Sequence, residues 1–197
     1  GIDHLTGSLT WRHGYHGETA HYKFLMTPLQ VSSAAHQAGK EKILCEMFGV
    51  SSEGICFSDM RYIEDFFTAL GINHRCIHGL FYSLRGRRKR TYVPHVSYQQ
   101  PWWKDFRTFL DYSARKNWLM RQGTPTADVL VLHPVESGFM EYECLRGQTK
   151  HLTGELSEEE TPEIERMNRR FVKLLEDMMG MHASLELGEE DTMAEWG

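Results

Sequence analysis

Glu46 is the residue of this sequence whose position most directly suggests chemistry. It follows the apolar run Ile43–Cys45 and precedes Met47, Phe48 and Gly49. This pattern predicts a short buried strand whose last residue is charged. A carboxylate at a strand end that borders a pocket can act as an acid, a base or a nucleophile, whereas a solvated loop residue or a helix-capping residue has no such role. We therefore take Glu46 as the candidate catalytic residue.

A second polar strand follows the next helix. Residues 72–82 form an apolar run that is interrupted by charged and imidazole side chains, and the predicted strand ends near His78 and Gly79. His78 is either a ligand-binding residue at the strand end or a core histidine that the backbone satisfies. Strand alternation places Arg75 on the opposite face, where an unpaired buried charge is costly. We expect the carboxylate partner of Arg75 to lie outside this chain.

A basic loop leads to an aromatic cluster. Five of the six residues from Arg85 to Arg90 are positively charged, and Tyr92, Tyr98, Trp102 and Trp103 follow them. Basic residues with stacking rings are typical of single-strand nucleic-acid binding. The chain as a whole has a net charge of -5 and the basic run does not recur, so we expect no nucleic-acid partner.

The N-terminal segment contains a cluster of histidines. His13, His16 and His21 are spaced by three and five residues in a setting that contains glycine. The cluster could be a metal site, a ligand-binding loop with Trp11 as its platform, or an ordinary polar loop. No cysteine joins these histidines, so we expect neither a metal site nor a cofactor.

The order of elements predicts an α/β protein. Helices are expected in the segments 19–39, 58–71 and 101–123, with Ser58 and Pro101 as start signals, and strands between them. Alternating helices and strands imply parallel strands that are covered by helices. The polar connection His133–Gly138 is expected to be a loop after the strand Val129–Leu132.

Composition sets limits on the class of protein. With 197 residues, 41% of them hydrophobic, the chain is long enough to bury a sizeable core. No apolar run approaches the length of a membrane span, so we expect no membrane partner. The four cysteines show no CxxC spacing and are expected to be free thiols, which favours a reducing, cytoplasmic compartment.

Three segments together carry a resemblance to a family. Ser32–Gly49, Gly71–Gly86 and Ser97–Ser137 resemble the C-terminal part of the catalytic region of large bacterial glycoside hydrolases of the α-L-rhamnosidase type. Those enzymes are similar in architecture to clan A β-galactosidases and β-glucuronidases, which have a (β/α)8 barrel. The resemblance implies a partial (β/α)8 barrel in residues 1–123. It also implies the truncated start of a flavodoxin-like domain in residues 124–197, a domain in which we expect a structural or oligomerising role.

The resemblance also implies the site residues. Glu46 resembles the catalytic glutamate on a late barrel strand, and it would act as the nucleophile of a retaining enzyme or as the general acid or base of an inverting one. The other carboxylate is expected on an earlier strand, so we expect this chain alone to be incomplete and inactive. A non-catalytic carbohydrate-binding or interaction module is the alternative. The residues expected to contact the carbohydrate substrate are Trp11, His78, Tyr82, Arg85, Tyr98 and Trp102.

Overall fold

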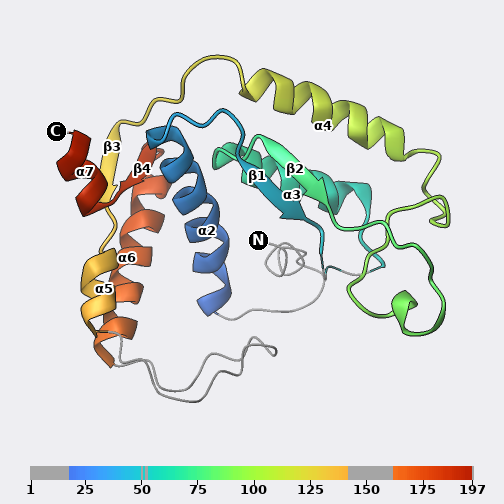
Figure 1. The fold of residues 1–197 in the computed structure, drawn as a ribbon, viewed down its shortest axis with the longest axis horizontal. Helices are drawn as coiled ribbons and strands as arrows, with labels where there is room; N and C mark the ends of the chain where they lie inside the picture. Colours follow the sequence, from blue (N-terminus) through green and yellow to red (C-terminus); the bar gives the residue numbers. More distant parts are fainter. Residues whose placement is uncertain (1–17, 50, 52, 142–161, 197) are drawn as a thin grey trace. The chain divides into compact units, whose positions relative to one another are not determined.

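The computed structural model describes residues 18–49, 51, 53–141 and 162–196. The chain divides into two compact units, residues 1–125 and 126–197, and the division falls two residues after the predicted boundary. Figure 1 shows helices and short strands in each unit. In the described part of the chain, no helix is both long and apolar enough to cross a bilayer.

The first unit alternates helices with two strands. In chain order its elements are α2 (Glu18–Gln37), β1 (Leu44–Met47), α3 (Phe57–Ala69), β2 (His74–Ile77), the 3₁₀ helix η3 (Gly86–Lys89) and α4 (Phe106–Met120). Strands β1 and β2 are parallel, and Glu46 is in register with Cys76. The predicted α/β class with parallel strands is therefore confirmed, whereas the partial (β/α)8 barrel stays a prediction.

The core of this unit lies on one face of the β1–β2 sheet. Cys45 and Met47 of β1 are buried there with Met60 and Phe67 of α3 and Phe109 of α4. The opposite face is more open, because Leu44 is 55% exposed and His74 and Cys76 are exposed. Glu46 belongs to this open face, since side chains alternate along a strand.

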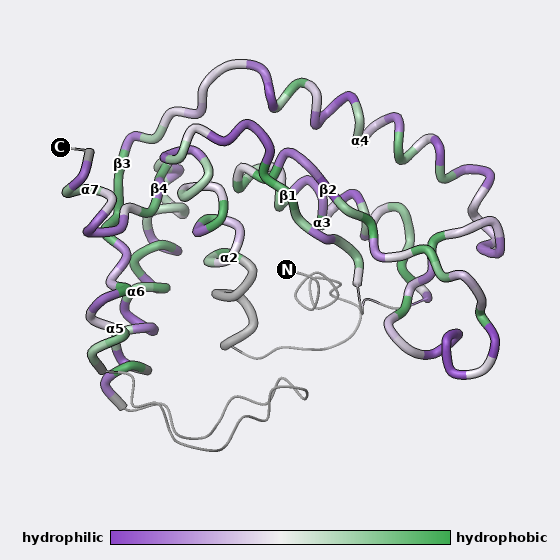
Figure 2. Tube along the Cα trace, viewed as in Figure 1, coloured by the Kyte–Doolittle hydropathy of each residue, from purple (hydrophilic) through white to green (hydrophobic). Residues whose placement is uncertain are grey.

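The second unit has the same kind of sheet. Its elements are β3 (Val129–Leu132), α5 (Val135–Glu141), α6 (Pro162–Gly180), β4 (Leu185–Gly188) and α7 (Glu190–Trp196), and β3 pairs with β4 in parallel. The flavodoxin-like assignment stays a prediction. Figure 2 shows hydrophobic and hydrophilic residues alternating along α4 and α6, as expected of helices that bury one side.

Three local predictions were wrong. The helix expected from Pro101 begins at Phe106, because the residues after Pro101 form turns. The connection His133–Gly138, expected to be a loop, contains the start of α5. Helix α3 is capped at Cys56 and not at Ser58, because the Asp59 carboxylate accepts the Cys56 backbone N–H at 3.1 Å.

The partner of Arg75 is also corrected. It lies in this chain, because Nη1 of Arg75 donates to Oε1 of Glu64 at 3.3 Å. Ser113 and Asn117 of α4 donate to the same oxygen, and Nζ of Lys116 lies 3.8 Å from it. These five residues, which we call the Glu64 network, connect α3, β2 and α4. Glu64 is only 1% exposed, so the network is part of the core.

Gly71 lies in the turn between α3 and β2, where the backbone packs closely on Ser32 of α2. Its φ is +95°, and a Cβ at this position would lie 2.7 Å from the Cβ of buried Ser32. We expect Gly71→Ala to lower the free energy of unfolding by about 2–4 kcal/mol, because the positive φ and the overlap each cost about 1–2 kcal/mol. Gly39→Ala is the control, since Gly39 also has a positive φ (+63°) but no atom within 4 Å of a Cβ. Thermal unfolding of both variants checks this, and equal losses would contradict the role of the Ser32 contact.

The contribution of Asp65 to stability is expected to depend on pH. Partial burial alone would raise the pKa of Asp65, but hydrogen bonds from Lys116 and Tyr112 and the Lys116 charge outweigh it, so the pKa lies below the usual 3.8. A lowered folded pKa contributes stability above pH 4 that is lost as pH falls through the folded pKa. We therefore expect Asp65→Asn to be less stable than the wild type at pH 7, by at most about 1 kcal/mol for this partly exposed group. The difference should shrink as the pH falls below 4, as denaturation at several pH values would show.

Candidate functional site at the carboxyl ends of β1 and β2

Glu46 lies near the carboxyl end of β1. It is the third residue of this four-residue strand and is partly buried on the face opposite α3 and α4. In parallel sheets covered by helices, ligands bind at the carboxyl ends of the strands. The position of Glu46 therefore meets the geometric requirement for a catalytic carboxylate.

His78 lies beside it at the end of β2. Its backbone N–H donates to the carbonyl of Met47 at 2.9 Å, so it extends the ladder by one residue past Ile77. Its Nδ1 is buried and has no hydrogen-bond partner among the described residues. The structure thus brings the two predicted residues Glu46 and His78 to neighbouring strand ends.

A polar cluster that the sequence did not predict joins the loops at this end. Oε1 of Glu53 lies 3.0 Å from Nδ1 of His95 and 3.4 Å from its backbone nitrogen, and both nitrogens face the carboxylate. Nε2 of Gln100 donates to Oε2 of Glu53 at 2.6 Å and to the His95 carbonyl at 2.9 Å. We call Glu53, His95 and Gln100 the Glu53 cluster. It connects the loop after β1 with the loop after β2.

The backbone fixes the place of this cluster. Val96, next to His95, donates its N–H to the carbonyl of Gly79 at 2.9 Å. Gly79 follows His78, so the Glu53 cluster belongs to the carboxyl end of β2. The partners of Glu53 in this cluster lie 42 and 47 residues further along the chain. No local pattern indicates such a pairing.

Phe81 lies between the two histidines. Its ring is edge-on to His78 at 5.9 Å between centroids and stacked on His95 at 6.3 Å. The guanidinium of Arg88 lies 5.8 Å from the centroid of the same ring. An aromatic ring with a cation and two imidazoles therefore borders the strand ends.

The other predicted contact residues are not brought into one cluster. Tyr82 and Tyr98 are exposed, at 107% and 77%, and Arg85 is exposed in the same loop region. Trp102 packs on Phe57 and Phe106, with centroid distances of 5.6 and 5.2 Å, so it belongs to the margin of the core. Trp11 and the side chains of the N-terminal histidine cluster lie outside the described residues.

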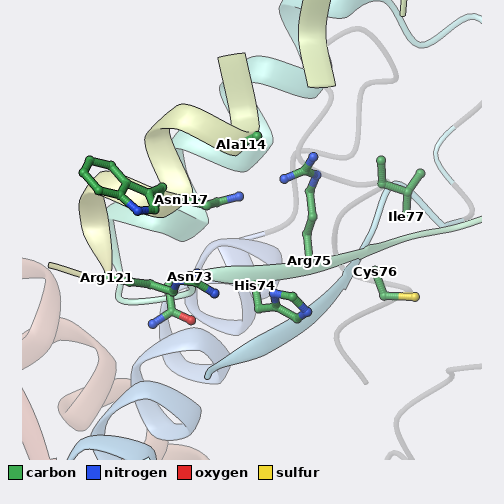
Figure 3. A pocket seen from close by; sticks show the side chains of 9 residues that line it. Asn73, His74, Arg75, Cys76, Ile77, Ala114, Asn117 and Arg121 are labelled. Atoms are coloured by element: carbon green, nitrogen blue, oxygen red, sulfur yellow. The ribbon is translucent and has the colours of Figure 1, made fainter. Parts of the chain in front are cut away.

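A groove of about 570 Å³ lies elsewhere in the first unit. It is lined by residues 73–77, by Ala114, Asn117 and Trp118 of α4, and by Arg121, which follows that helix. Figure 3 shows Arg75 extending from β2 toward α4 and Cys76 pointing away. The groove includes neither Glu46 nor His78, so it is distinct from the candidate site.

Three carboxylates of the second unit lie close enough together to hold a metal ion. Carboxylate oxygens of Glu136, Glu189 and Asp191 lie within 4.8 Å of one another. A hydrogen bond and the charge of Glu190 raise the pKa of Glu136. Glu136 and Asp191 belong to the short helices α5 and α7, and Glu189 directly precedes α7. Exposed acidic groups of this kind are common without a metal.

The fold and the site define the first unit as an α/β structure with polar groups gathered at the carboxyl ends of parallel strands. The chain is similar to a protein from Formosa agariphila named "Putative beta-glucuronidase", with 30% identity over 115 residues. The matched segment is 56% of this chain but only 10% of that relative. No family model matches the chain, and no solved structure matches it. The comparison supports a relationship to glycoside hydrolases in a general way.

Proposed function

We propose that this chain is part of a glycoside hydrolase with a (β/α)8 barrel, in which β1 and β2 are late strands. The observation that carries the proposal is the position of Glu46, a partly buried carboxylate on the open face at the carboxyl end of a parallel strand. The similarity to a protein named as a beta-glucuronidase supports the same class of reaction. The substrates we propose are terminal glycosides, with rhamnosides, galactosides and glucuronides as the first candidates.

The chemistry requires two carboxyl groups. One protonates the departing oxygen, and the other attacks the anomeric carbon or activates a water molecule. We assign Glu46 to one of these roles and expect the second group on a strand outside this chain. A separation of about 5–5.5 Å between the two groups would give retention of configuration, and about 6.5–9.5 Å would give inversion.

A panel of fluorogenic glycosides tests the proposal. The gene product that contains this chain is assayed with α-L-rhamnosides, β-D-galactosides and β-D-glucuronides, and we expect turnover of at least one. Turnover of one sugar would establish the glycosidase and identify its substrate. Sugar binding without turnover of any glycoside would replace the proposal with a carbohydrate-binding module.

A further inference from the structure

The Glu53 cluster fixes the position of the hydrogen on the His95 ring. A carboxylate has no hydrogen to donate, so the contact between Glu53 and Nδ1 of His95 requires hydrogen on Nδ1. Gln100 cannot supply that hydrogen, because its two amide hydrogens are directed at Glu53 and the His95 carbonyl. The short distance of 3.2 Å between Gln100 Nε2 and His95 Nδ1 is therefore a close approach of two donors that share one carboxylate.

When the His95 ring is neutral, the other ring nitrogen is a hydrogen-bond acceptor. In the neutral ring with hydrogen on Nδ1, Nε2 carries a lone pair. Nε2 is buried and has no partner among the described residues, and His95 is only 8% exposed. A buried polar atom without a partner costs about 1–3 kcal/mol, so an oriented acceptor of this kind indicates a ligand.

The surroundings of His95 indicate how a ligand reaches Nε2. Phe81 stacks on the imidazole, and its neighbours Leu80 and Tyr82 are 77% and 107% exposed. This loop can shift without opening the core, since its residues are absent from the buried core cluster. Phe81 also contacts His78, so the stacked imidazole of His95 lies at the end of the sheet where Glu46 and His78 lie.

From these contacts we infer that Nε2 of His95 accepts a hydrogen bond from a hydroxyl group of the sugar, while Glu53 and Gln100 hold the ring in place. The inference rests on the proposed glycosidase function and adds a residue that determines which sugar is bound. His78 offers a second buried nitrogen on the other side of Phe81. His95 is the better defined of the two because its orientation is fixed by a carboxylate and an amide.

The test is His95→Asn in the gene product that contains this chain. An asparagine amide can still donate to Glu53, as Nδ1 does, but it has no atom in the place of Nε2. All proteins also carry Glu46→Gln, so that substrates are bound without turnover. Calorimetry measures the affinity for methyl β-D-glucuronide, methyl β-D-galactoside, methyl α-L-rhamnoside and their monodeoxy analogues. His36→Gln is the matched control, because His36 lies near Gly71 at the amino end of β2.

We expect His95→Asn to weaken binding of the preferred glycoside by roughly 3–10-fold, the equivalent of one neutral hydrogen bond. One monodeoxy analogue should bind equally to the protein with and without His95→Asn, because it lacks the hydroxyl that Nε2 accepts. Unchanged affinity, or the same loss for every analogue, would overturn the role of His95 but leave the glycosidase proposal in place. Failure of all three glycosides to bind would overturn both.

Discussion

Replacing Glu46 by glutamine is expected to lower kcat for the preferred glycoside by roughly 10²–10⁴-fold, the usual contribution of a positioned acid or base. Glutamine has the size of glutamate but neither the negative charge of its carboxylate nor the acidic proton of its carboxylic acid form. It can therefore neither attack the anomeric carbon nor activate water as the carboxylate would. Sugar affinity should change little, since the substitution acts on the reacting atoms. Steady-state kinetics and calorimetry on the gene product measure the two effects separately.

The control for this prediction is Glu41→Gln. Glu41 is an exposed glutamate shortly before β1, and its backbone carbonyl, not its carboxylate, accepts a hydrogen bond from Asn73 at 3.0 Å. Its substitution should leave kcat within about twofold of the wild type, because surface changes away from the reacting atoms are nearly neutral. If Glu46→Gln retained more than about a tenth of wild-type activity, Glu46 would not be a catalytic carboxylate.

Patterns of local sequence predicted the elements that position Glu46. An apolar run predicted β1, and helical spacing of Met60, Ile63 and Phe67 predicted α3, whose buried side chains include these residues. Both signals are short-range, because a strand or helix that covers a core must repeat its apolar side chains with a fixed period. The parallel pairing followed from the alternation of helices with strands, and the structure confirms it.

Contacts between distant segments could not be predicted in the same way. Nothing near Glu53 in the sequence indicates its pairing with His95 and Gln100. The burial of Arg75 predicts a carboxylate partner but not which one, although Glu64 lies only 11 residues before it. Which carboxylate meets which cation depends on how α3 packs on the sheet, and that packing has no local sequence signal.

The residue expected to start a helix did not do so where side-chain packing favoured another backbone conformation. Pro101 is well suited to the first position of a helix, yet α4 begins at Phe106. The residues between them form turns, and Trp102 and Trp103 both contact the ring of Phe106, at 5.2 and 6.0 Å between centroids. The packing of these rings on Phe106 outweighs the preference of a single terminal residue.

The ion pair between Arg75 and Glu64 is expected to stabilise the first unit substantially. Substituting Arg75 by methionine removes the donor that lies 3.3 Å from a carboxylate with only 1% of its side-chain surface exposed. Removing one partner of a buried ion pair typically lowers the free energy of unfolding by about 3–5 kcal/mol, because the remaining charge stays buried without a partner and without hydration. Lys116, Ser113 and Asn117 still contact Glu64, so we expect a loss near the lower end, about 3 kcal/mol. Urea denaturation monitored by tryptophan fluorescence measures this loss of stability. All proteins carry Trp196→Phe, which removes the one tryptophan of the second unit, so that the signal reports on the first unit.

Two further variants separate loss of charge pairing from loss of packing. Arg107→Met disrupts an exposed pair on α4, where Arg107 and Asp111 are 3.6 Å apart and 87% and 52% exposed, and should cost at most about 0.5 kcal/mol. The double variant Glu64→Met/Arg75→Met should recover most of the stability lost in Arg75→Met, because two apolar side chains leave no unpaired charge in the core. If the double variant were less stable than Arg75→Met alone, the hydrogen bonds of Glu64 to Ser113 and Asn117 would outweigh the ion pair. The network would then stabilise the packing of α3 on α4 through neutral donors and not through charge.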